Sequence, residues 1–394
     1  MAEDCDALRR TYRYRIYPTV RQRLALEGQL RFACQLYNAA LEQRRYAWRG
    51  RHRSVTLYEQ FRELTDIRAA GMGPAQMNCS AMRDPLRRLD RAYAAFFRRV
   101  RAGATPGYPR FRSARRYDSL TWESGWAVRL DRLALGGIGQ LKVKWHRRLP
   151  PAGVVRTVTV RRLAGRWYAC FSLTLPRSPR LAAPGRTAVG IDLGIQQFAT
   201  LSTGKQLLGP RAYRAGMRRL RVAARRVSRR QKGSHRRQKA GLLLAREYQR
   251  IRNLRHDHAH KLTRRLVAEF GLIAIEDLNI LGLARGLLAL DVTDQGWAAF
   301  VRILEYKAAE AGTRIIRVPP RRTSMTCSGC GALVPKLLSE RTHQCVDCGL
   351  VIDRDTNAAR NVLRLGLSRQ ALTWPAGASV AWEGVPETSG ALLP

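Results

Sequence analysis

The sequence predicts an α+β protein of several domains, in which a β-barrel interrupted by helices is followed by an α/β domain with an inserted metal-binding segment. Three observations lead to this prediction. In the first half, the hydrophobic period changes from two residues to about 3.6 and back again. In the second half, short apolar runs end in carboxylates, and two Cys-x2-Cys pairs separate the last such run from a helix. The 394 residues can form two or three domains, each with its own core.

The barrel strands are expected at both ends of the first half. Residues 11–18 alternate aromatic or apolar side chains with basic ones and end at a proline, which is typical of a half-buried strand. Residues 154–175 contain two β-rich runs around Ala164-Gly165, which predicts a hairpin. We expect one β-barrel from residues 1–18 and 103–183.

Residues 19–102 are expected to form a helical insertion in this barrel. Apolar residues recur at steps of three and four between Val20 and Trp48, which predicts a long helix. A second helix is predicted to begin at Asp84-Pro85, because aspartate is a favoured N-cap and proline suits the first helical position. The apolar faces of these two helices should pack together and leave arginine-rich faces outside.

The α/β domain is expected to comprise residues 184–324 and 350–366. Apolar strands are predicted at 188–192 and 272–276, and residues 198–202 suggest a hairpin partner for the first. Between them, residues 211–270 are strongly basic and predict two helices that are separated near Lys232-Gly-Ser234.

The order of elements continues to the end of the chain. Thr293-Asp294 is expected to cap a helix that Gly312 ends, and a strand should follow at 313–318. Residues 356–365 predict a last helix, and residues 367–394, rich in Gly, Pro, Ala and Ser, are expected to be a poorly ordered tail.

Residues 325–349 are expected to be a zinc ribbon. Cys327-x2-Cys330 and Cys345-x2-Cys348 are 14 residues apart, one fewer than the usual range for such a ribbon. Four thiolates on two tight turns suit tetrahedral Zn²⁺ and leave no position for water or substrate, so the metal should be structural. The alternatives are disulfides or cysteines that bind nothing. The remaining cysteines are scattered, which fits a reducing compartment.

Three acidic residues end apolar segments of the second half: Asp192, Glu276 and Asp355. A carboxylate in such a place needs a cation or hydrogen bonds. If the three converge, they could bind two Mg²⁺ ions about 3.5–4 Å apart, which would clamp the attacking and leaving oxygens of a phosphodiester. Alternatives remain. Asp192 could belong to a plain turn and Glu276 to a capped strand end, and one of Asp353 and Asp355 could only cap the helix.

The charge of the chain points to a polyanionic partner. The 72 Lys and Arg against 29 Asp and Glu give a net charge of +43, and self-repulsion on this scale favours binding to nucleic-acid phosphates. A membrane is the competing polyanion, but no apolar run reaches about 18 residues. The first residues do not resemble a signal peptide, so we expect a cytoplasmic protein. The expected nucleic-acid contacts are Arg87, Arg91, Arg98, Arg218, Arg225, Arg229, Lys232 and Arg236.

The motifs of the second half resemble those of TnpB proteins, the transposon-encoded relatives of type V CRISPR effectors. They are Gly190-Ile-Asp192-Leu-Gly-Ile195, Ile275-Glu276-Asp-Leu-Asn279, Thr323-Ser-x-x-Cys327-x-x-Cys330 and Asp353-Arg-Asp355-x-Asn-Ala-Ala359. Segments of the first half are also similar, among them Arg15-Ile-Tyr-Pro-Thr19 and Gly107-Tyr-Pro-Arg-Phe111. The resemblance covers nearly the whole chain except the first ten residues and the tail.

The resemblance implies an RNase H-like domain of RuvC type, in which Asp192, Glu276 and Asp355 bind Mg²⁺ and cut DNA. It also implies a guide RNA bound across the barrel and the basic helices, and double-stranded target DNA recognised beside a short target-adjacent motif. Two other functions are considered: a guided DNA-binding protein that does not cut, and a transposase that joins strands. The sequence does not distinguish a transposon-encoded protein from a small CRISPR effector, and the oligomeric state stays open.

Overall fold

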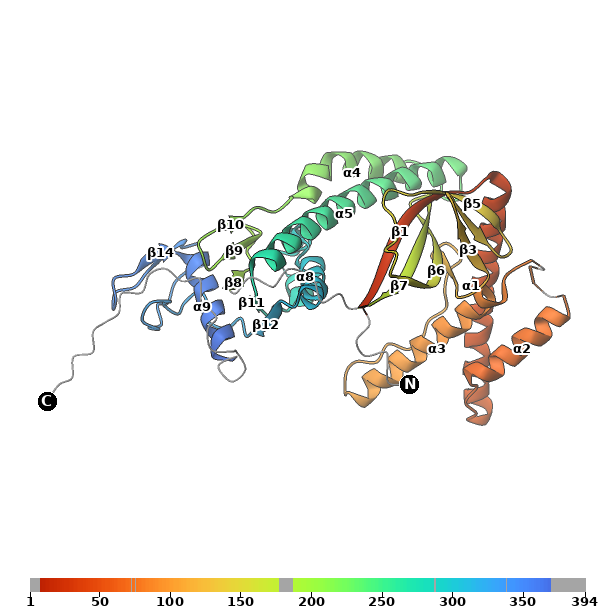
Figure 1. The fold of residues 1–394 in the computed structure, drawn as a ribbon, viewed down its shortest axis with the longest axis horizontal. Helices are drawn as coiled ribbons and strands as arrows, with labels where there is room; N and C mark the ends of the chain where they lie inside the picture. Colours follow the sequence, from red (N-terminus) through yellow and green to blue (C-terminus); the bar gives the residue numbers. More distant parts are fainter. Residues whose placement is uncertain are drawn as a thin grey trace. The chain divides into compact units, whose positions relative to one another are not determined.

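The structure, a computed structural model, describes residues 8–71, 73–74, 76–176, 187–286, 288–337 and 339–369. The chain divides into two compact units, Met1–Arg177 and Ser178–Pro394, and each has its own hydrophobic core (Figure 1). Within the described ranges, no helix combines the length and apolar composition that crossing a membrane requires. The expected tail is helical as far as Ser368, and the rest of it, from residue 370 on, lies outside the described residues.

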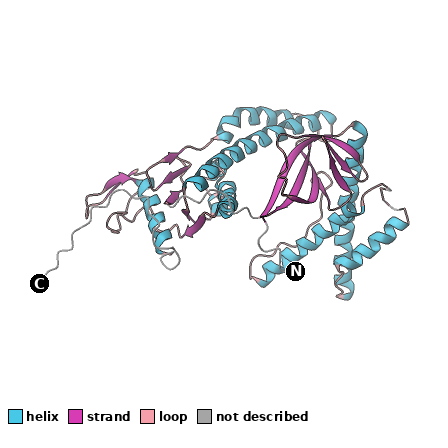
Figure 2. Ribbon diagram, in the orientation of Figure 1, coloured by secondary structure: helices cyan, strands magenta, loops and turns pink. Residues whose placement is uncertain are grey.

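The first unit contains a seven-stranded antiparallel sheet with the order β2-β6-β7-β1-β5-β4-β3. Its strands are drawn in magenta in Figure 2. Strand β1, Leu8–Tyr17, lies at the centre because it pairs with β7 on one side and β5 on the other. The predicted hairpin is confirmed, since Ala164 and Gly165 both have positive φ, as its two-residue turn requires. The other strands are β2 (Ser119–Trp122), β3 (Trp126–Arg129), β4 (Arg132–Leu135), β5 (Gly139–Lys144), β6 (Val154–Leu163) and β7 (Arg166–Leu175).

The predicted β-barrel needs a correction, because hydrogen bonds do not close the sheet. The edge strands β2 and β3 form no ladder with each other in the described part of the chain, although only residues 123–125 separate them. That link spans at most about 14 Å, so the sheet must curl until its edges approach. The buried carboxylate of Asp84 accepts a hydrogen bond from the Thr121 N–H on β2 (3.2 Å). A side chain of the helical insertion therefore covers one edge.

The helical insertion contains three helices, α1 (Val20–Arg51), α2 (Leu57–Ala69) and α3 (Cys79–Arg101). Helix α2 was not predicted from the sequence, although it starts with a capping box of Thr56 and Glu59. The predicted start of α3 at Asp84-Pro85 was wrong. Asn78 caps this helix, because its side-chain oxygen accepts hydrogen bonds from the backbone N–H groups of Ser80 and Ala81. Asp84 instead accepts a hydrogen bond from Thr121 and forms an ion pair with the guanidinium of Arg88 (2.7 Å).

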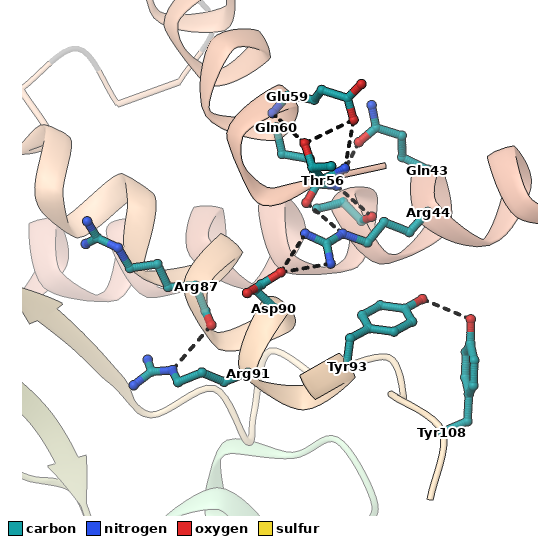
Figure 3. A network of polar contacts seen from close by, with 11 residues as sticks. Gln43, Arg44, Thr56, Glu59, Gln60, Arg87, Asp90, Arg91, Tyr93 and Tyr108 are labelled. Atoms are coloured by element: carbon teal, nitrogen blue, oxygen red, sulfur yellow. Dashed lines mark hydrogen bonds and ion pairs between the residues drawn. The ribbon is translucent and has the colours of Figure 1, made fainter. Parts of the chain in front are cut away.

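A buried arginine on α1 joins the three helices, as Figure 3 shows. The Arg44 guanidinium donates to Gln60 on α2 (3.0 Å) and to Asp90 on α3 (3.2 Å). It also lies 5.3 Å from the ring centroid of Tyr93. The expected packing of α1 on α3 is confirmed for the amino-terminal part of α3, where Leu86 is buried, whereas the far end of this helix is exposed.

The second unit contains a five-stranded sheet with the order β10-β9-β8-β11-β12. The three strands predicted from apolar runs, β8 (Ala188–Asp192), β11 (Leu272–Glu276) and β12 (Arg314–Val318), are parallel neighbours. The hairpin partner of β8 is confirmed as β9 (Ala199–Leu201), and β10 (Gln206–Leu207) extends it. A small separate ladder joins β13 (Thr342–Gln344) to β14 (Val351–Asp353) beside the cysteines.

Helices cover both faces of the five-stranded sheet. Alternate side chains of β8 and β11, such as Val189 and Ile273, pack with α5 (His235–Glu269) and α8 (Trp297–Ala311). The intervening residues, such as Ala188 and Ala274, face α9 (Arg354–Ser368). This alternation is what a strand buried on both faces produces.

The basic stretch forms two helices, α4 (Ala212–Ser228) and α5, and Ser234 caps α5 after the predicted break. The remaining helices are α6 (Ile280–Leu283) and α7 (Ala289–Gln295). The prediction that Thr293-Asp294 starts the next helix was wrong, because α8 begins after Gly296. Asp294 instead lies in α7 and accepts the backbone N–H groups of Tyr213 and Arg214 (2.7 and 3.1 Å), so it caps α4 from outside.

Candidate functional site

Two of the predicted carboxylates lie at the same end of neighbouring parallel strands. Asp192 is the last residue of β8, and Glu276 is the last residue of β11. The register pairs Ile191 with Ile275, which brings the two strand ends together. Because both strands are apolar and covered on both faces, their final side chains emerge at the carboxyl edge of the sheet, where α/β folds place their ligands.

Asp355 reaches the same edge from α9. A Cβ built on Gly194, in the loop after β8, would lie 3.8 Å from Asp355 Oδ2. Helix α9 comes this close because Gly190 faces it: a Cβ there would stand 2.1 Å from the Ala359 carbonyl oxygen. Glycine therefore permits the contact between strand and helix backbone that positions Asp355.

Asp353 has a different task from Asp355. Its Oδ1 accepts hydrogen bonds from the Thr356 N–H (2.9 Å) and hydroxyl (3.0 Å), so it is the N-cap of α9. Asp355, in the first turn, contacts two guanidinium groups instead: Arg354 donates to its Oδ1 (3.2 Å), and Arg341 lies 3.8 Å from its Oδ2. The charges of both aspartates raise the pKa of Asp192, and Asp355 has the larger effect.

The three carboxylates repel one another electrostatically. Burial raises the pKa of Asp192 well above its usual range, and the negative charges of Glu276 and Asp355 raise it further, while Arg354 acts in the opposite direction. Burial also raises the pKa of Glu276, which is 8% exposed, whereas a hydrogen bond from the Thr323 hydroxyl (2.6 Å) lowers it. Carboxylate oxygens that repel one another fit a divalent cation such as Mg²⁺, because its positive charge would offset the repulsion.

The four cysteines form a compact cluster. Their sulfur atoms lie within 4.8 Å of one another. Within the described ranges no other three or more His, Cys, Asp and Glu residues bring their ligand atoms this close, so the three carboxylates are less tightly grouped than the cysteines. The two knuckles have the same geometry, because the N–H groups of Gly331 and Gly349 each donate to the first cysteine carbonyl of their pair (3.0 Å). Amide N–H groups of Cys348 and Asp347 lower the pKa of Cys345 to about 7. This set of soft donors fits Zn²⁺.

Two buried asparagines of α9 fasten the cysteine segment to the helix. Asn357 accepts from the Ser328 N–H (2.9 Å) and donates to the Thr326 carbonyl (2.8 Å). Asn361 donates to the carbonyls of Thr326 (2.6 Å) and Thr323 (2.9 Å). Neither these residues nor Thr323 were predicted to have a role, although Asn357 and Thr323 belong to two of the TnpB-like motifs. Together they connect Glu276, the cysteine segment and the helix that carries Asp355.

Seven of the eight basic side chains expected to contact nucleic acid are exposed: Arg91, Arg98, Arg218, Arg225, Arg229, Lys232 and Arg236. Arg87 is the exception, since it is half-buried and forms an ion pair with Glu123. Because Glu123 already neutralises it, Arg87 is a weaker candidate for a phosphate contact than the other seven.

Comparison with known proteins identifies relatives over most of the chain. A family model described as "Probable transposase" matches residues 171–286, and one described as "Cas12f1-like, TNB domain" matches residues 297–362. A Streptomyces pristinaespiralis protein named "Putative RNA-guided DNA endonuclease" is 36% identical, with 92% of this chain and 91% of that protein aligned. The Escherichia coli protein "Putative RNA-guided DNA endonuclease InsQ" is 30% identical, with 72% and 74% aligned.

Structural comparison agrees with these matches. A cryo-EM structure of a Cas12f1-sgRNA-target DNA complex covers 91% of this chain and 99% of its own, with a TM-score of 0.60 and 13% identity. At this identity the likeness concerns the fold alone. A Cas12f1 endodeoxyribonuclease from Sulfoacidibacillus thermotolerans is 31% identical over a third of each chain. This chain therefore belongs to the TnpB-type family of proteins related to the Cas12f1 effectors.

Proposed function

We propose that this chain is an RNA-guided endonuclease that cuts target DNA beside a short target-adjacent motif. The observation that carries the proposal is that Asp192 and Glu276 end neighbouring parallel strands, and that the charges of Glu276 and Asp355 raise the pKa of Asp192. The names of the relatives supply the guided function, because they describe RNA-guided DNA endonucleases and a Cas12f1-sgRNA-target DNA complex.

In this proposal the three carboxylates hold two Mg²⁺ ions, which stabilise the attacking and leaving oxygens of the phosphodiester. The chain contributes the placement of the ligands: β8 and β11 fix Asp192 and Glu276, and α9 presents Asp355. Thr323 orients Glu276, and the zinc-bound cysteines hold α9 in place through Asn357. The exposed basic side chains bind the backbones of the guide RNA and target DNA, while base pairing reads the sequence. A protein with this substrate acts in the cytoplasm.

The first experiment identifies the guide. The chain is expressed with its native flanking DNA and purified without nuclease treatment, and the bound RNA is sequenced. We expect one discrete RNA whose matching DNA is cut when Mg²⁺ is present. If the bound RNA is heterogeneous, or if no RNA is bound, the net charge of +43 gives only nonspecific affinity for nucleic acid. That result would contradict the guided function.

The second experiment tests the carboxylates with the same RNA-loaded protein. D192N, E276Q and D355N should each abolish cleavage and leave RNA binding intact. D353S is the matched control, since serine keeps an N-cap on α9 but removes a carboxylate two residues from Asp355. Cleavage that survives all three substitutions would contradict the proposed site. Target DNA that stays whole with wild-type protein would favour a guided DNA-binding protein that does not cut.

A further inference from the structure

Two adjoining cavities lie between α1, α3 and the connector of residues 103–117 in the first unit. The inner cavity has a volume of about 340 Å³, and the outer groove has a volume of about 450 Å³. They share Tyr37, Ala92, Arg112 and Arg116 and so form one continuous depression, which we call the connector groove. Because all its walls belong to one compact unit, it is a property of that unit alone.

The connector groove carries uncompensated positive charge. Six arginines line it against one carboxylate, Asp118, which is already paired with Arg161 (2.9 Å). Arg112 and Arg116 have no acidic partner among the described residues, and the Arg112 guanidinium lies 5.5 Å from the ring centroid of Tyr37. Arg88 and Arg91 contact the carboxylate of Asp84 (2.7 and 3.9 Å), so the excess of positive charge rests on the other four arginines. Guanidinium groups in such excess over carboxylates attract a phosphate.

Tyr117, which lines the inner cavity, has a buried hydroxyl group without a partner. Tyr117 is 5% exposed, yet its phenol oxygen has no hydrogen-bond partner. Burial raises the pKa of Tyr117, so the phenol stays protonated at neutral pH and can donate. A buried polar group without a partner is costly. A phosphate oxygen among the surrounding arginines would supply the missing acceptor.

The outer groove offers aromatic faces. Tyr108 and Phe111 are 44% and 49% exposed, although both line the groove. The Tyr108 hydroxyl is hydrogen-bonded to that of Tyr93 on α3 (2.9 Å), which fixes the orientation of its ring (Figure 3). The Arg45 guanidinium lies 5.3 Å from the Phe111 ring centroid. Half-exposed aromatic rings beside guanidinium planes are the usual platform on which proteins stack single-stranded bases.

We propose that the connector groove binds one unpaired nucleotide of a nucleic-acid strand, with its phosphate in the inner cavity and its base against Tyr108 and Phe111. A base inside a duplex already has both faces stacked, so it cannot use this platform. The proposal deepens the proposed function and rests on it in one respect, namely that nucleic acid is the partner. RNA and DNA share the chemistry on which it depends.

Fluorescence binding assays with the full-length D192N protein test the proposal without cleavage. The probes are a 12-nucleotide RNA, the matching single-stranded DNA and the blunt duplex. Y117F should weaken single-strand binding about tenfold and leave the melting temperature unchanged or higher, because it removes only an unpartnered hydroxyl. Y108A/F111A should weaken single-strand binding about tenfold or more and abolish the quenching of a 2-aminopurine base. Y58A, which removes a more exposed aromatic ring on α2, is the control and should have no effect.

The outcomes separate this proposal from the nuclease proposal. If Y117F and Y108A/F111A bind single strands as tightly as Y58A does, the groove is not a nucleotide site, even if guided cleavage is observed. If single-strand and duplex affinities fall equally, the groove binds phosphate without an unpaired base, and the proposal is wrong. Selective loss for single strands supports it even if D192N turns out not to affect cleavage, and tighter binding of the RNA probe would identify RNA as the occupant.

Discussion

Replacing Gly190 by alanine should disable cleavage without touching a carboxylate. The added Cβ would stand 2.1 Å from the Ala359 carbonyl oxygen and 2.7 Å from the Leu363 nitrogen, both backbone atoms of α9. No rotamer change relieves a clash with backbone, and non-bonded atoms prefer about 3.5 Å, so strand and helix must separate by about 1 Å. Overpacking of this kind costs about 1–3 kcal/mol of stability. Because α9 carries Asp355, the ligand moves with it, and a displacement of about 1 Å can reduce the rate about 10²-fold.

Single-turnover cleavage with RNA-loaded protein, together with thermal unfolding, measures both effects. G241A is the matched control in the same unit, because a Cβ on Gly241 in α5 meets no atom within 4 Å. This control should cleave at the wild-type rate and unfold at the same or a higher temperature, since alanine favours a helix. A G190A protein that cleaves like G241A would refute the inference that the contact of β8 with α9 positions Asp355.

Four more predictions concern the same unit. G366A should destabilise the protein, because the new Cβ would lie 2.6 Å from the Ala274 Cβ. The double variant A274G/G366A should recover most of the lost stability. A double variant as unstable as G366A would contradict the contact. In T323V the pKa of Glu276 should rise, because the hydrogen bond that lowers it is lost. The acid limb of the cleavage pH profile should therefore move to higher pH. T323S, which keeps a hydroxyl group, should have the wild-type profile. Without metal, the raised pKa of Asp192 means that the folded state holds a proton that the unfolded state has released, so stability should fall as pH rises from about 4 through the raised pKa. D192N should remove this part of the pH dependence of the melting temperature, and Mg²⁺ should oppose it in the wild type only. Zinc chelation, or C327S/C330S, should reduce cleavage even in excess Mg²⁺, because Asn357 ties the cysteine segment to α9; full activity in that variant would show that the cluster is dispensable.

The expectations that the structure confirmed depend on residues that are close together in the sequence. The parallel strands could be predicted from the sequence because each is an apolar run, such as residues 272–276. The runs are apolar because these strands are covered on both faces. The Ala164-Gly165 hairpin and the break before Ser234 follow from turn and cap chemistry. The cysteine spacing likewise requires two adjacent knuckles.

The expectations that failed concern side chains whose partner is distant in sequence. Asp84 and Asp294 both resemble N-caps of the helices that follow them, but each serves another element: Asp84 the edge of β2, and Asp294 the start of α4. The local sequence correctly indicated that each aspartate accepts backbone N–H groups. It could not show which N–H groups these are, because they lie far away in the sequence. The unclosed sheet also involves a distant partner, since Asp84 accepts an N–H of the edge strand β2.

The sequence by itself determined the family and the cysteine cluster and predicted the three carboxylates, because these depend on residue type and spacing along the chain. Only the tertiary structure decided that Asp353 caps α9, and that Asp355 has a larger effect than Asp353 on the pKa of Asp192. It also decided that Thr323, Asn357 and Asn361 connect the cysteine segment with the carboxylates. The connector groove became visible only once α1, α3 and the connector had folded together, because a cavity is a property of packing and has no linear signature.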